Sequence, residues 1–127
     1  MSPGPRSPLD RIRAVCLALP GVTERLSHGT PTFFVRDRTT FVYAWVEGHH
    51  DHAFPHLWCA CGPGVQEVLI GAEPEHFFRP PYVGHRGWVG VRLDGDVGWD
   101  EVGELCQDAF RAVAPRRLVA ELDDRAG

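Results

Sequence analysis

The densest cluster of potentially reactive side chains in this sequence is HHDHAFPHLWCAC, which runs from His49 to Cys61 and holds four of the seven histidines and two of the four cysteines. Imidazole and thiolate groups bind zinc and copper well, and structural zinc sites usually contain pairs of ligands two to four residues apart. Cys59 and Cys61 have this spacing, but no second pair follows at zinc-finger spacing. A metal site is one hypothesis, whereas a solvated polar loop is the interpretation that we favour. The candidate ligands are His49, His50, His52 and His56.

The four cysteines are expected to be core residues. Cys59 and Cys61 fall on a predicted strand, where residues two apart point the same way. Cys16 and Cys106 lie on apolar faces of predicted helices, and a free cysteine behaves as a small buried hydrophobic residue. The sequence contains no disulfide framework and no nucleophile motif such as GxSxG. We expect no catalytic residues and no cofactor; a hydrolase that uses Cys59 or Cys61 is a less favoured alternative.

All thirteen basic residues are arginines, and the 127-residue chain contains neither lysine nor asparagine. This composition excludes chemistry that needs a lysine, such as a Schiff base or a Walker-type phosphate loop. The formal net charge is -4 and the arginines are scattered, which disfavours non-specific binding to nucleic acid because such binding depends on neutralising phosphates. No apolar run reaches the ~18 residues of a membrane span, and the N-terminus lacks the apolar segment of a signal peptide. We expect no membrane association and a cytoplasmic location.

One domain is expected to occupy residues 8–122. Residues 1–7 are predicted to be a disordered lead-in, because the MSPGPR segment has no apolar periodicity. Residues 123–127 are predicted to be a frayed acidic tail. The chain is long enough to bury a single core without disulfides or metals.

Two long amphipathic helices are predicted. Ser7 is a suitable N-cap and Pro8 a suitable first residue for a helix that Pro20-Gly21 ends. The second helix starts at about Trp99 and ends before Pro115, and a short final helix follows it. Both long helices need an apolar surface against which to bury one face.

Three β-rich segments are predicted to form an antiparallel sheet. They are a hairpin over about residues 32–46, HLWCAC at residues 56–61 and GWVGVRLDG at residues 87–95. Residues 21–29 are predicted to be a loop, and residues 72–86 a proline-interrupted connection with at most one helical turn. A short helix precedes that connection, and its inward residues are expected to be Val65, Val68 and Leu69. The natural arrangement is a two-layer α+β domain.

An aromatic stripe is the most informative pattern for function. In FVYAW, alternation places Phe41, Tyr43 and Trp45 on one strand face. Trp88 and Arg92 share the face of their strand that points away from the helices, because the apolar residues that alternate with them should meet the helices. If these faces coincide, they form an aromatic surface with an arginine, suited to stacking bases, a ring-bearing ligand or a partner chain. The alternative is that the rings are core residues or are covered by residues 72–86.

Two segments of the chain resemble the MmcQ/YjbR-like family. They are LPGVTERLSHGTPTFFVRDRTTFVYA and PPYVGHRGWVGVRLDGDVGWDEVGELCQDAFRAVAPRRL, and the similarity extends from about Leu9 to Leu118. It rests on the order and spacing of several short features. These are Leu19-Pro20-Gly21, Gly29 with Pro31, the hairpin, Tyr82, Trp88 and Trp99-Asp100-Glu101.

The resemblance implies a fold similar to secretion-chaperone-like and frataxin-like domains, with a curved antiparallel sheet of about four to five strands packed on helices. The family is often labelled DNA-binding and has no established activity or catalytic residues to carry over. This chain departs from it at Gly84-His85-Arg86-Gly87, where family members often have Asn-Lys and a further basic residue.

The sequence therefore predicts a non-enzymatic binding domain that uses an open aromatic and arginine-bearing sheet face. Nucleic acid is the partner suggested by the family label, and a small organic anion or a protein partner is the physical alternative. A metal-binding function of the histidine loop, residues 49–56, is the other alternative. The expected ligand-binding residues are Tyr82, His85, Arg86, Trp88, Arg92 and Trp45.

Overall fold

The computed structural model of the protein describes residues 7–126, so the expected lead-in, apart from Ser7, lies outside the described residues. The helices are α1 (Pro8–Cys16), α2 (Val65–Ala72), α3 (Trp99–Val113) and α4 (Arg116–Ala126), with a 3-10 turn, η1, at Gly84–Arg86. The strands are β1 (Val22–Ser27), β2 (Thr30–Val35), β3 (Thr39–Trp45), β4 (His56–Cys59), β5 (Phe77–Phe78) and β6 (Val89–Arg92). Within residues 7–126 no helix has both the length and the apolarity needed to cross a membrane.

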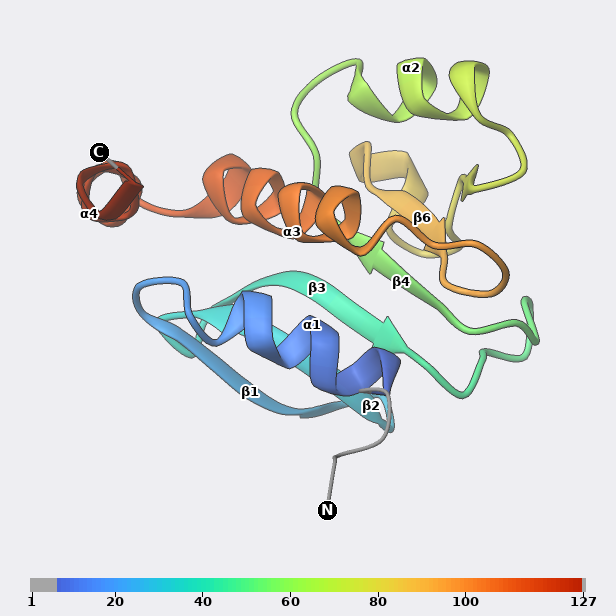
Figure 1. Cartoon of the computed structure of the whole chain (residues 1–127), viewed down its shortest axis with the longest axis horizontal. Coiled ribbons are helices and arrows are strands. Elements are labelled where there is room, and N and C mark those ends of the chain that lie inside the picture. The colour runs from blue at the N-terminus through green and yellow to red at the C-terminus, as the bar shows by residue number, and fades with distance from the viewer. Residues whose placement is uncertain (1–6, 127) are drawn as a thin grey trace.

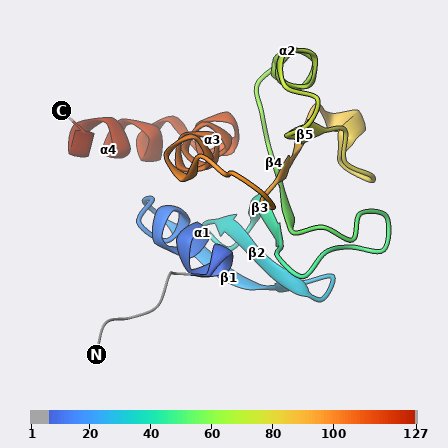
Figure 2. The same ribbon diagram turned by 45° about the vertical axis from the view of Figure 1, so that its right-hand side comes forward.

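The strands form one antiparallel sheet in the order β1-β2-β3-β4-β6-β5. Helices α1 and α3 lie along one side of this sheet with α4 beyond α3, whereas the segment between β3 and β4 projects away from them (Figures 1 and 2). The predicted α+β class is confirmed. The sheet has six strands in the described residues, where four to five were expected.

The additional long strand is β1, in a region that was expected to be a loop. It pairs with β2 over its whole length, from Val22 opposite Val35 to Ser27 opposite Thr30. None of its side chains is fully buried, so the apolar alternation that reveals a strand in sequence is missing. Backbone pairing at the sheet edge therefore forms β1 without a strong sequence signal.

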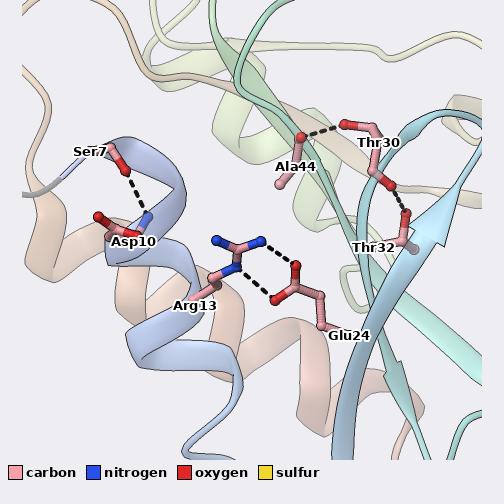
Figure 3. A network of polar contacts seen from close by, with 7 residues as sticks. All are labelled: Ser7, Asp10, Arg13, Glu24, Thr30, Thr32 and Ala44. Carbon is pink, nitrogen blue, oxygen red and sulfur yellow. Dashed lines mark hydrogen bonds and ion pairs between the residues drawn. The ribbon is translucent and has the colours of Figure 1, made fainter.

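An ion pair joins this edge strand to the helix layer. Arg13 of α1 donates from Nε to Oε1 of Glu24 at 2.8 Å and from a terminal guanidinium nitrogen to Oε2 at 2.7 Å (Figure 3). The helix itself starts as predicted, because the Ser7 hydroxyl accepts the N–H of Asp10 at 3.1 Å. The ion pair between Arg13 and Glu24 holds α1 against β1, the strand that follows it in the chain.

A β-bulge in β3 changes the faces predicted for FVYAW. The pairing of β3 with β2 skips Phe41, and this residue therefore turns toward the helices. Its ring meets that of Phe110 edge-on, with centroids 6.0 Å apart. Tyr43 and Trp45 remain on the opposite face. The prediction that all three rings share a face was wrong for Phe41, because simple alternation fails at an extra residue.

The cysteines occupy the core, as expected. Cys16, Cys59 and Cys106 are fully buried, and Cys61 is partly buried. Burial raises the pKa of the Cys16 thiol well above its usual value, so this sulfur stays protonated near neutral pH. A protonated thiol enclosed in the core is a packing group.

The connection from β4 to β6 departs most from prediction. In α2 the buried side chain is that of Gln66, whereas Val65 and Val68 are 38% and 69% exposed, so the predicted inward position was wrong for these two valines. Leu69 is partly buried against the core, as expected. Gln66 Nε2 donates to the carbonyl oxygens of Gly84 at 2.9 Å and of Trp88 at 2.5 Å. A polar residue points inward here because two buried backbone acceptors need a donor.

The final helix, α4, is longer than expected. Residues 123–126 continue it, where the sequence analysis predicted a frayed tail. Leu118 and Leu122 bury one side of α4, and Arg125 donates to the carbonyl oxygen of Ala18 at 2.9 Å. Packing against the rest of the domain therefore extends the helix through an acidic segment.

Candidate ligand pocket on the aromatic face

The sheet face opposite the helices carries an aromatic cluster from β3 and β4, which we call the aromatic floor and define as Tyr43, Trp45 and Trp58. Tyr43 stands directly opposite Trp58 in the strand register. The ring of Trp58 lies 5.6 Å from that of Tyr43 and 5.0 Å from that of Trp45, measured between centroids. Trp88 supports this floor, with its ring centroid 5.8 Å from that of Tyr43. Together these contacts form a continuous aromatic surface.

A cavity of about 650 Å³ lies on this floor. This volume is within the range of about 300 to 1,000 Å³ typical of small-molecule sites. Two connections add its walls, namely the histidine loop after β3 and the loop that precedes η1. The residues that line the cavity are His28, Tyr43, Trp45, Gly48, His49, His50, Trp58, Tyr82 and Val83.

The first wall is a tight hairpin turn. His49 and His52 exchange backbone hydrogen bonds of 2.8 and 3.0 Å, so His50 and Asp51 form a two-residue turn between them. Gly48 has a positive φ of 87°, and a Cβ there would lie 2.4 Å from the carbonyl oxygen of Ala53, so only glycine fits this position. The backbone of the loop is therefore ordered by its own hydrogen bonds.

This turn places the His49 ring on the aromatic floor. Its centroid lies 4.7 Å from that of Trp45 and 5.3 Å from that of Trp58. The His49 side chain is only 7% exposed, whereas those of His50 and Asp51 are 71% and 44% exposed. The interpretation as a solvated loop therefore holds for the tip of the turn and was wrong for His49.

Tyr82 forms the opposite wall. It is 68% exposed, and its ring lies 6.4 Å from that of Trp58 and 6.2 Å from that of His49. Its φ is +64°, an uncommon value for a residue other than glycine. The Gln66 hydrogen bonds to Gly84 and Trp88 hold the segment that follows this loop. Residues in uncommon backbone conformations are often found at binding sites, and Tyr82 is such a residue at the edge of an aromatic cavity.

The pocket contains no fixed positive charge. Among the residues that the structure describes, no arginine lines it, and the sequence has no lysine. Burial lowers the pKa of His49 below its usual value, and the neighbouring His50 lowers it further, so its ring is neutral near pH 7. The nearest carboxylate is that of Asp51, 3.6 Å from Nε2 of His50. The cavity therefore suits uncharged or weakly cationic groups better than anions.

The structure divides the six expected binding residues between this pocket and other places. Trp45 and Tyr82 line the pocket. Trp88 is 3% exposed and supports the floor. His85 and Arg86 are exposed beside the pocket but do not line it, and the Arg86 guanidinium lies 5.3 Å from the Trp88 ring centroid.

Arg92 is also outside the pocket. Its guanidinium lies over the Phe54 ring at 4.0 Å and forms two hydrogen bonds with the Asp94 carboxylate, at 3.0 and 2.7 Å. Arg92 shares the sheet face of Trp58, because it pairs with His56 in the strand register, but it does not line the cavity. The arginine is used in contacts within the protein.

The four candidate histidine ligands also separate into two pairs. His49 and His50 come together with Asp51, and one potential ligand atom from each of these three residues lies within 4.8 Å of the others. His52 and His56 instead pack with Phe78, at ring-centroid distances of 4.4 and 5.4 Å. The four histidines therefore lie in two different environments, one at the pocket and one beside Phe78.

Several pocket residues were not among the expected binding residues. The alternation in FVYAW puts Tyr43 on the same face as Trp45, and Trp58 lies in the predicted strand HLWCAC. No sequence pattern indicated His28, which reaches the pocket across strand β2 and lies 6.2 Å from Tyr43 between ring centroids. Asp51 was overlooked as a possible ligand because its position depends on the backbone pairing of His49 with His52.

The fold and pocket define a class of small α+β domains with an open antiparallel sheet and a cavity on its uncovered face. The sequence model of the YjbR family matches residues 17–112, and the chain belongs to this family. The resemblance proposed from sequence is therefore confirmed.

A solved structure supports the fold. The crystal structure of Deinococcus radiodurans protein DR2400, a DUF419-domain protein, matches with a TM-score of 0.71 at 24% sequence identity. The match covers 85% of this chain and 79% of that chain. No protein with a curated description matches the sequence.

Proposed function

We propose that this YjbR-family protein is a non-enzymatic binding domain whose pocket holds a flat, ring-bearing organic molecule. The observation that carries the proposal is that four aromatic side chains, Tyr43, Trp45, Trp58 and Tyr82, border one cavity of about 650 Å³. Stacking of a planar group on an aromatic side chain contributes about 1 to 3 kcal/mol in nucleic-acid complexes, where the same geometry has been measured by alanine substitution.

The exposure of Tyr82 supports a ligand on the aromatic floor beside its ring. Its ring is 68% exposed although it faces the floor at 6.4 Å from Trp58. A planar molecule on the floor removes apolar surface of Tyr82 from water, and burial contributes about 25 cal/mol per Å². Tyr82 therefore gains favourable burial when a ligand is bound.

The charge of the pocket favours a neutral ring over a phosphate-bearing one. Arg86 and Arg92, the residues expected to hold an anion, do not line the cavity. An anion buried there would lose hydration without gaining a cationic partner, which is costly. The proposed ligand is thus an uncharged or weakly cationic ring compound, and the nucleic-acid label is not supported by this site.

Binding of 2-naphthamide, a flat neutral two-ring compound, tests this proposal. Isothermal titration calorimetry in EDTA-containing buffer, with adenosine and thymidine titrated in parallel, measures affinity for the full-length protein. We expect Trp45→Phe and Tyr82→Ala each to reduce the 2-naphthamide affinity by about tenfold, since each removes part of a stacking surface.

The matched control is Trp99→Phe, because Trp99 is a half-buried tryptophan that packs near Arg11, away from the pocket. It should leave the affinity unchanged. Equal losses in Trp45→Phe and Trp99→Phe, or no binding of any of these compounds at millimolar concentration, would contradict the proposal.

A further inference from the structure

The turn at the mouth of the pocket brings three metal-binding side chains together. The Nε2 atom of His50 lies 3.6 Å from one carboxylate oxygen of Asp51, and Nδ1 of His49 lies 4.0 Å from the other. In a tetrahedral site with bonds of about 2.0 to 2.1 Å, the ligand atoms are separated by roughly 3.3 Å. One potential ligand atom from each residue lies within 4.8 Å of the others, so contraction by about 1.5 Å or less would bring these donors around one ion.

The backbone that presents these donors is already fixed. The two hydrogen bonds between His49 and His52 close the turn, and the His49 ring is held against Trp45 and Trp58. The side chains that must adjust are those of His50 and Asp51, which are exposed and free to rotate at little cost. Metal binding would therefore require movement of the His50 and Asp51 side chains only, since the His49 ring is already held in place, and the fold need not rearrange.

The present partners of these donors are weak. His49 Nδ1 accepts the backbone N–H of Asp51 at 3.2 Å, which leaves that nitrogen without a proton. Coordination through this atom replaces one exposed hydrogen bond, whose net contribution is about 1 kcal/mol. The Asp51 carboxylate has only the two imidazoles within ion-pair distance among the described residues.

The chemistry of the donor set favours transition metals and zinc over calcium and magnesium. Two imidazoles and one carboxylate suit zinc, nickel or copper, whereas calcium and magnesium prefer oxygen ligands alone. Three protein ligands leave at least one coordination position for another molecule. Because His49 and His50 both line the cavity, an ion between them lies at the wall of the pocket.

We propose that His49, His50 and Asp51 bind one zinc or nickel ion, and that this ion anchors a ring-bearing ligand that carries its own oxygen donor. This inference rests on the proposed function for the position of the ring. The bound ion supplies the positive charge that the metal-free pocket lacks, so the ligand class extends to flat ring compounds with a carboxylate, phenolate or keto oxygen at one edge. The ring stacks on the aromatic floor and the oxygen completes the coordination of the ion.

Metal binding is measured first, with zinc chloride and nickel chloride as the probes. Full-length protein produced without a histidine tag is stripped with EDTA, dialysed and titrated by calorimetry. We expect one ion per chain, and at least about a tenfold loss of affinity in His50→Gln and in Asp51→Asn. Nickel should also quench tryptophan fluorescence, because the His49 ring lies 4.7 Å from that of Trp45.

The matched controls are His76→Gln and His85→Gln, which remove histidines that do not belong to the turn. They should retain the wild-type stoichiometry and affinity. Metal affinity that is unchanged in Asp51→Asn, or that falls equally in the control variants, would show adventitious binding by scattered histidines and overturn the proposal.

The coupling to the ligand is measured by comparing 2-naphthoate with 2-naphthamide, which share a ring system but differ in their oxygen donor. Zinc-loaded protein should bind 2-naphthoate at least about tenfold more tightly than EDTA-treated protein does, and Asp51→Asn should abolish this difference. The affinity for 2-naphthamide should not depend on zinc. Binding of 2-naphthamide without any zinc effect on 2-naphthoate overturns the metal anchor and leaves the ring pocket intact, whereas one zinc per chain without ring binding overturns the pocket.

Discussion

At the scale of single residues, the most constrained polar side chain is His56. It is fully buried in β4, and its Nδ1 donates to the carbonyl oxygen of Phe54 at 2.7 Å, while Nε2 is buried without a protein partner. Burial lowers the pKa of His56 below the usual value of 6.5; the hydrogen bond to Phe54 opposes this shift and His52 adds to it. The folded protein therefore holds this imidazole neutral at a pH where the unfolded chain protonates it.

This difference predicts a loss of stability in acid. As the pH falls below about 6.5, the unfolded chain binds a proton at His56 before the folded protein does, so the free energy of unfolding decreases until the pH reaches the lowered folded-state pKa. Urea denaturation at a series of pH values from 7.5 to 5 measures this slope. His56→Asn, which keeps an amide donor for Phe54, should be less stable at pH 7.5 but should show a smaller slope; an unchanged slope would assign the effect to other groups.

At the scale of elements, one side chain, that of Gln66, connects α2 to the segment around η1. Gln66 joins the helix to the chain on both sides of η1, because its Nε2 donates to the carbonyl oxygens of Gly84 and Trp88. Val65 and Val68 on the same helix remain exposed, and Leu69 and Ile70 are only partly buried. The position of α2 therefore depends on the Gln66 hydrogen bonds as well as on apolar burial.

Replacement of Gln66 by leucine tests this dependence. Gln66→Leu leaves two buried carbonyl oxygens without their donor, and we expect a loss of about 2 to 4 kcal/mol in the free energy of unfolding. The control is Gln107→Leu on α3, because Gln107 is exposed and should change stability by less than about 0.5 kcal/mol. Equal effects of the two substitutions in urea denaturation would show that the Gln66 hydrogen bonds are not important.

Sequence patterns predicted the elements whose signal is local. Ser7, Pro8 and the apolar stripe of α3 specify their helices without help from distant residues. Strand β1 has no such signal, because pairing with β2 rather than side-chain alternation defines it. The bulge at Phe41 and the inward position of Gln66 depend on residues far away in sequence, which no local pattern contains.

The same distinction applies to the site. The aromatic residues of the floor follow from strand alternation once the bulge is known. The grouping of His49, His50 and Asp51 depends on a two-residue turn whose pairing sequence alone did not indicate. Arg92 was assigned to the site from its strand position, but it is paired with a neighbouring carboxylate.

At the scale of the whole molecule, the balance of charge disfavours general binding to nucleic acid. The net charge is -4, and arginines of α1, β1, β6, α3 and α4 form ion pairs within the fold. Affinity for nucleic acid depends on cations that remain available to phosphates. The distribution of charge therefore agrees with a pocket for a small molecule.

We accordingly expect no mobility shift of a duplex DNA probe with tens of micromolar protein at about 0.1 M salt. The experiment compares the wild-type protein with Arg86→Ala and Arg92→Ala at low and moderate salt. A shift that weakens steeply with salt and is lost in these variants would contradict the expectation, because it would show a phosphate-binding surface outside the pocket.

The order of the strands has a consequence for how this fold can change its specificity. β4 and β6 are neighbours in the sheet, but the chain between them, residues 60–88, is long. It forms α2, pairs with the outer side of β6 as β5, and carries Tyr82 in the connection that returns to β6. The floor of the pocket belongs to β3 and β4. The wall that contains Tyr82 belongs to a connection whose two ends lie on neighbouring strands of the sheet. Connections of this kind tolerate changes in length and sequence better than the strands they join. We therefore expect substitutions in the connection that carries Tyr82 to change ligand specificity at less cost to folding than substitutions in β3 or β4.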